Sequence, residues 1–121
     1  MQTIFVVDDT EACREPMARL LRAEGYDTLC ACNGLEALEA LQETMPALVL
    51  LDLAMPEMDG IQFLKAIHND PKWVDLPVIV VSGEASGPLR DAKEMGAKEV
   101  LVKANFTPSQ LLDSIRRHLP V

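Results

Sequence analysis

The chain has 121 residues, of which 49% are hydrophobic and 25% are charged, and this size and composition indicate one compact domain around one core. Its formal net charge of −8 argues against direct nucleic-acid binding, which depends on a basic surface, and suits a divalent cation or a basic protein partner. No apolar run approaches the roughly 20 residues needed to span a membrane, and the first residues do not resemble a signal peptide. We therefore expect a single cytoplasmic domain over residues 1–121, with no effector domain and no membrane contact.

Short apolar runs alternate with segments of helical periodicity in the first part of the chain. The apolar run Thr3–Val7 predicts a buried strand and is followed by a helical pattern from about Glu11 to Glu24. A second strand is predicted at Thr28–Cys32, and Asn33 is then a suitable N-cap for a helix that stops before Pro46. The expected apolar residues of this helix are Leu35, Leu38, Leu41 and Met45.

The same alternation continues to the end of the chain. The remaining predicted strands are Ala47–Leu51, Val78–Val81 and Glu99–Val102. The helical segments between and after them run from Ile61 to His68, from Pro88 to Gly96, and onward from Thr107. Thr107 at the cap, Pro108 at the first position and Gln110 at the third form a strong helix-start signal.

Five successive strand–helix units predict a doubly wound α/β sandwich with a parallel sheet. In such a sheet the reactive groups lie at the carboxyl ends of the strands. The side chains at those predicted ends are Asp8, Asp9, Asp52, Ser82 and Lys103. The topology therefore predicts three carboxylates, one hydroxyl and one amine at one edge of the sheet.

This combination of side chains suits phosphoryl transfer. Clustered carboxylates repel one another, and Mg²⁺, which prefers oxygen ligands, relieves that repulsion. An ionised carboxylate can attack phosphorus and form an acyl phosphate, and a hydroxyl and an ammonium can then bind the added negative charge. Each residue alone has an ordinary explanation, as a helix cap, a turn residue or a solvated lysine, but their joint placement at strand ends favours a site.

Four segments resemble the receiver domain of bacterial two-component response regulators. They are Phe5–Asp9, Leu50–Gly60, Val78–Gly83 and Gly96–Lys103. The four segments occur in the family's order, and the resemblance covers essentially the whole chain. The resemblance implies a flavodoxin-like (βα)5 fold with strand order 2-1-3-4-5.

The resemblance also implies roles for individual residues. Asp52 would accept a phosphoryl group from a histidine kinase or a phosphotransfer protein, and Ser82 and Lys103 would bind that group. In the implied Mg²⁺ site, Asp9 and Asp52 are direct ligands, Asp8 acts mostly through water, and the backbone carbonyl of Ala54 completes the protein ligands. The resulting change in protein contacts would pass the signal to an output protein that the sequence does not identify.

The chain departs from the family pattern at the read-out positions. Val100 stands three residues before the lysine, where the family usually has an aromatic residue, and Ala104 follows the lysine in place of proline. Because a cis bond before a non-proline residue costs about 2.5–4 kcal/mol, we predict a trans Lys103–Ala104 peptide. Ala54 and Glu84 lie where the family tunes acyl-phosphate lifetime, and Ala54 has no side chain that could orient a water.

Two other functions remain open from the sequence. One is an aspartate-nucleophile phosphohydrolase, although such an enzyme normally carries Asp-x-Asp after its first strand, where this chain has Asp8-Asp9-Thr10. The other is a receiver-like interaction module that is not phosphorylated; the intact acidic site argues against it, but the altered residues around Lys103 keep it open.

A few further residues have structural interpretations. The cysteines Cys13, Cys30 and Cys32 are expected to be reduced and buried, because their number is odd and their spacing is not that of a secreted protein. Trp73 is expected to pack locally as a lid over the core, and His68 and His118 are expected at helix surfaces.

Overall fold

The computed structural model describes residues 2–8, 11–52, 60–82, 96–102 and 106–119. The strands in this part of the chain are β1 (Thr3–Val7), β2 (Asp27–Ala31), β3 (Leu48–Leu51), β4 (Val78–Ser82) and β5 (Glu99–Val102). The helices are α1 (Glu11–Ala23), α2 (Gly34–Glu43), α3 (Gly60–His68) and α5 (Pro108–His118). The predicted helix between Pro88 and Gly96 lies outside the described residues.

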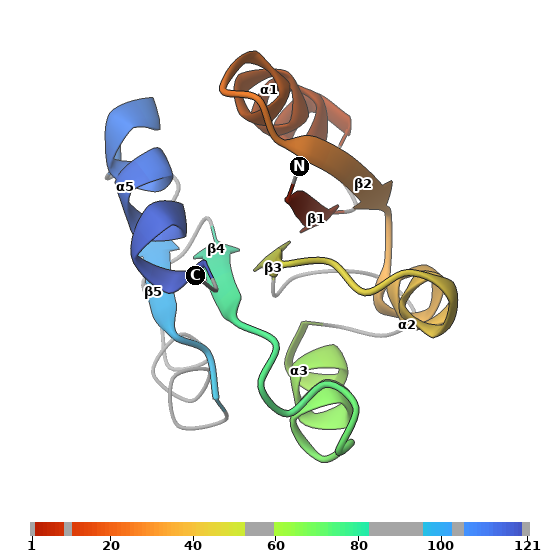
Figure 1. Ribbon diagram of the computed structural model, residues 1–121. Helices are drawn as coiled ribbons and strands as arrows, with labels where there is room; N and C mark the ends of the chain where they lie inside the picture. The colour runs from red at the N-terminus through yellow and green to blue at the C-terminus, as the bar shows by residue number, and fades with distance from the viewer. Residues whose placement is uncertain (1, 9–10, 53–59, 83–95, 103–105, 120–121) are drawn as a thin grey trace.

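The five strands form one parallel sheet in the order β2-β1-β3-β4-β5. Helices α1 and α5 lie on one face of this sheet, and α2 and α3 lie on the other (Figure 1). Both the doubly wound architecture and the strand order predicted from the sequence are confirmed. No helix in the described residues is long and apolar enough to cross a membrane.

Two apolar clusters hold the layers together, one on each face of the sheet. Alternate residues of β1 explain the division, because Phe5 and Val7 pack toward α2 and α3, whereas Ile4 and Val6 pack toward α1 and α5. All four side chains are fully buried. Burial on both faces is why the sequences of β1 and β3 are almost continuously apolar rather than alternating.

The capping signals in the sequence produce the expected helix starts. The Asn33 side chain accepts a hydrogen bond from the backbone N–H of Glu36 at 2.8 Å. At α5, Thr107 accepts from the Gln110 N–H at 3.2 Å, and the Gln110 side chain accepts from the Thr107 N–H at 2.8 Å. Each cap satisfies backbone groups that the first helical turn leaves without partners.

The apolar face predicted for α2 is partly wrong. Leu35 is 46% exposed and Met45 is 54% exposed, whereas Ala37 and Leu41 are buried. Met45 lies beyond the end of the helix at Glu43, so helical spacing no longer determines where its side chain points. Ala37 and Leu41 are four residues apart and form the face that packs on the sheet.

Trp73 behaves as predicted, because it is 5% exposed and belongs to the cluster under α2 and α3. The Lys72 amine lies 5.4 Å from the centre of its ring, within the range of a cation–π contact. The connection between α3 and β4 thus closes the core at the end of the sheet where the strands begin.

A group of polar side chains joins the start of β5 to the end of α5. The Glu99 carboxylate accepts hydrogen bonds from Ser114 and from Arg117, the latter at 2.8 Å, and lies 3.2 Å from Nε2 of His118. Ser114 is fully buried, whereas Arg117 is exposed. His118 is thus half-buried against β5 rather than a simple surface residue, and His68 is exposed as expected.

Two glycines with positive φ allow a direct test of backbone geometry. Gly25 has φ +92° with open space around it, whereas a Cβ on Gly96, at φ +110°, would lie 2.6 Å from Nδ1 of His68. We expect Gly25→Ala to cost about 1–2 kcal/mol of unfolding free energy from the backbone alone, and Gly96→Ala to cost more. Urea denaturation measures both values.

His68→Ala provides the control for the contact at Gly96. In the His68→Ala background the cost of Gly96→Ala should fall to that of Gly25→Ala, because only the backbone cost remains. Equal costs for the two glycine substitutions in the wild-type background would contradict this prediction.

Glu99 makes the stability of the fold depend on pH. Partial burial acts to raise the pKa of Glu99, but the hydrogen bond from Ser114 and the hydrogen bond and charge of Arg117 act against it. His118 adds a further hydrogen bond, and the pKa of Glu99 is lowered overall. Its contribution to stability is therefore present above the unfolded-state pKa of about 4.3 and is lost as the pH falls through the folded-state pKa.

We accordingly expect Glu99→Gln to reduce the loss of unfolding free energy between about pH 6 and about pH 3. Urea denaturation at several pH values measures this loss. Glu43→Gln, which changes an exposed glutamate at the end of α2, is the matched control and should keep the wild-type pH dependence. If Glu99→Gln and Glu43→Gln showed the same pH dependence of the unfolding free energy, Glu99 would not be the residue responsible for it.

Candidate functional site

The pairing of β1 with β3 places Asp8 and Asp52 side by side. Val7 lies opposite Leu51 in this parallel pair, and each aspartate is the next residue. The Asp52 N–H donates to the carbonyl of Val7 at 2.9 Å, and the Asp8 N–H donates to the carbonyl of Ala31 at 3.1 Å. Sheet hydrogen bonding therefore continues one residue past the strands and fixes both aspartates at its carboxyl edge.

Both aspartates are buried, although they are ionisable. Asp8 is fully buried and Asp52 is 6% exposed. Neighbouring strands lie about 4.8 Å apart, so two acidic side chains share a region of low dielectric, where like charges repel strongly. Such a pair is costly unless a cation or hydrogen-bond donors offset its charge.

The other predicted site residues are placed to different extents. Ser82 is the last residue of β4 and lies opposite Val102 of β5, so its backbone is at the same edge of the sheet. Lys103 follows Val102 directly but lies outside the described residues, as do Asp9 and Ala54. The structure thus brings Asp8 and Asp52 together and places the end of β4 on the same edge.

The predicted metal site is compatible with the described residues. Two adjacent buried carboxylates are the ligand type that Mg²⁺ prefers. Within the described ranges, no three acidic, histidine or cysteine side chains form a metal-binding group. Asp9 and Ala54, the other expected ligands, are not among those residues.

The read-out positions can be compared only in part. Val100 is half-buried and packs against the cluster under α2 and α3. The trans Lys103–Ala104 peptide stays a prediction, because both residues lie outside the described part of the chain. Glu84 lies outside it as well.

A polar contact next to Asp8 was not predicted from the sequence. The Cys32 thiol donates to the Glu36 carboxylate at 3.0 Å; Cys32 directly follows the last residue of β2, which pairs with Val7. The expectation that the cysteines are buried is wrong for this pair, because Cys30 is exposed and Cys32 is half-buried. The sequence signal for the contact between Cys32 and Glu36 was the position of Glu36 itself, an acidic residue in the first turn of α2 after the Asn33 cap.

Comparisons with known proteins identify the family. The family model described as response regulator receiver domain matches residues 4–116, and the chain belongs to this family. Receiver domains are phosphorylation-based switches of two-component signalling rather than classical enzymes. They interact with histidine kinases or phosphotransfer proteins and with output partners, and they bind Mg²⁺ in general.

Individual relatives match over nearly their whole length. The chain is 35% identical to sporulation initiation phosphotransferase F of Bacillus subtilis (strain 168), over 99% of this chain and 95% of that protein. It is 32% identical to protein PilG of Pseudomonas aeruginosa, over 97% and 87% respectively. Among solved structures, the chemotaxis protein CheY4 of Vibrio cholerae superposes with a TM-score of 0.89 at 31% identity, covering 98% of this chain and 99% of that one.

If Asp8 and Asp52 hold Mg²⁺, the ion should stabilise the folded protein. At a concentration ten times its dissociation constant, Mg²⁺ should add about 1.4 kcal/mol to the free energy of unfolding. Asp8→Asn and Asp52→Asn should each reduce this gain, because each removes a negative charge from the predicted site. Thermal or urea denaturation with and without Mg²⁺ measures it.

Asp27→Asn is the control for this experiment. Asp27 is an exposed residue at the start of β2, on the opposite edge of the same sheet, so the substitution should keep the full gain. An equal gain in all three variants would show that Mg²⁺ acts away from the predicted site.

Proposed function

We propose that Asp52 accepts a phosphoryl group from a histidine kinase or a phosphotransfer protein and that the phosphorylated form makes a different protein contact. One observation carries this proposal: Asp52 is buried beside Asp8 at the carboxyl edge of a parallel sheet in a receiver-family chain. The backbone hydrogen bond from Asp52 to Val7 fixes the nucleophile without using its side chain.

The proposed reaction is a direct transfer. A carboxylate oxygen of Asp52 forms a bond to phosphorus while the phosphorus–nitrogen bond of the donor's phosphohistidine breaks. The imidazole leaves with the electron pair of that bond and is protonated. Bound Mg²⁺, held by Asp8, Asp9, Asp52 and the carbonyl of Ala54, would neutralise negative charge on the phosphoryl oxygens.

The product needs additional donors, because the phosphoryl group brings a charge of about −2. Ser82, at the end of β4, would donate its hydroxyl hydrogen to a phosphoryl oxygen. Lys103, which follows β5 in the sequence, would supply an ammonium. Movement of both toward the phosphoryl group would repack the surface of β5, α5 and the helix predicted between Pro88 and Gly96.

Intact mass measurement after incubation with Mg²⁺ and acetyl phosphate tests this proposal. We expect one phosphoryl adduct on the wild-type chain, and the adduct should be absent from Asp52→Asn and retained in Asp27→Asn. A wild-type chain without an adduct would favour an interaction module that is not phosphorylated. Rapid hydrolysis of phosphate esters over many turnovers would instead favour a phosphohydrolase.

A further inference from the structure

The four residues of β5 run from the end of the sheet where the strands begin to the end where Asp52 lies. Glu99 is the first residue of this strand, and Lys103 directly follows its last residue, Val102. In the described part of the chain β5 pairs only with β4 and forms one side of the sheet. All four of its residues are half-buried, whereas β3 is buried throughout and β1 is buried from Ile4 to Val7, so β5 has the lower local burial that goes with easier displacement.

Glu99 connects this strand to the last part of α5. Its carboxylate receives hydrogen bonds from the fully buried Ser114 and from Arg117, and it lies 3.2 Å from His118. All three partners are on α5. Because the carboxylate is charged and only 25% exposed, these bonds are stronger than those of a fully solvated pair.

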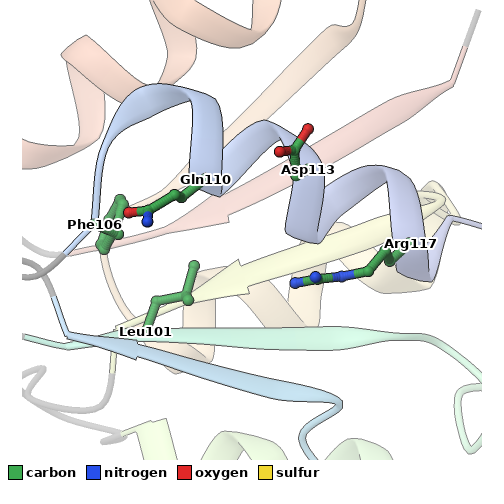
Figure 2. Close-up of a pocket in the computed structure, with 5 residues that line it drawn as sticks. All are labelled: Leu101, Phe106, Gln110, Asp113 and Arg117. Atoms are coloured by element: carbon green, nitrogen blue, oxygen red, sulfur yellow. The ribbon is translucent and has the colours of Figure 1, made fainter.

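The same helix borders a groove against β5. Five residues line the groove, which has a volume of about 300 Å³: Leu101, Phe106, Gln110, Asp113 and Arg117. Figure 2 shows Arg117 reaching from the last turn of α5 toward Leu101. Arg117 therefore belongs both to the wall of the groove and to the polar group around Glu99.

The two faces of β5 show why Glu99 is the residue that connects this strand to α5. Val100 packs toward α2 and α3, whereas Leu101 packs toward α1 and α5. Val100 is therefore on the wrong face to reach α5. Among the described residues of β5, Glu99 makes side-chain hydrogen bonds to α5, and Leu101 adds apolar contact.

We propose that Glu99 is a positioning residue that transmits phosphorylation of Asp52 to α5. A displacement of Lys103 toward the phosphoryl group moves β5, and Glu99 carries that movement to Arg117 and the end of α5. The groove between β5 and α5 then changes shape without an aromatic side chain at position 100. This inference rests on the proposed phosphorylation of Asp52.

Amide hydrogen exchange of the full chain, with and without acetyl phosphate and Mg²⁺, tests the inference. Intact mass of the same samples reports the extent of phosphorylation. In the wild type we expect phosphorylation to change the exchange rates of the α5 amides near Ser114 to His118 by about threefold or more. Glu99→Gln should reduce this change to less than about twofold at the same extent of phosphorylation.

Two further variants make the test specific. Arg117→Gln removes one of the three contacts of Glu99 from an exposed position on the helix and should reduce the change in part, and adding it to Glu99→Gln should cause no further loss. Glu24→Gln removes the 3.5 Å ion pair to Arg116, which joins α5 to the residue after α1 and not to β5. It should keep the wild-type response.

Three results would overturn the inference. If the wild type is phosphorylated but its α5 amides exchange at unchanged rates, phosphorylation is not transmitted to α5, and the proposed function stays intact. If Glu99→Gln and the wild type respond equally to phosphorylation, Glu99 has a structural role only. This holds even where the α5 amides of the variant exchange faster both with and without phosphorylation. A wild type that forms no adduct removes the proposed function and this inference with it.

Discussion

The parallel register of β1 and β3 is the constraint on which the rest of the structure depends. It aligns Val7 with Leu51 and so places two aspartates next to each other, buried, at the point where the strands end. Hydrophobic burial on both faces of the sheet offsets the cost of holding these charges out of water. A slip of one residue would turn Phe5 and Val7 toward the wrong cluster, so the packing of the core also fixes the site.

Much of this arrangement could be predicted from the sequence, because its signals are local. The sequence pattern predicted β1 and β5 with the observed bounds, and the capping box at Thr107 predicted the start of α5. The strand order followed from the family resemblance. The positions of Asp8 and Asp52 required only the rule that parallel strands expose their carboxyl ends on one edge.

The sequence was less informative where contacts join distant segments. Glu99 follows a turn and begins a strand, and nothing near it in the sequence indicates that Ser114 and Arg117 will bind its carboxylate. The exposure of Met45 was missed for a related reason, since helical spacing does not show where α2 stops. The thiol of Cys32 reaches Glu36 only because the chain leaves β2 and turns into α2.

The buried position of Trp73 has a consequence for spectroscopy. It is the chain's single tryptophan, it is 5% exposed, and it packs where the strands begin rather than where Asp52 lies. Its fluorescence therefore reports the integrity of the core under α2 and α3, and it is remote from any ion or phosphoryl group at the other edge. An optical signal for the state of Asp52 would have to come from a fluorophore introduced beside α5.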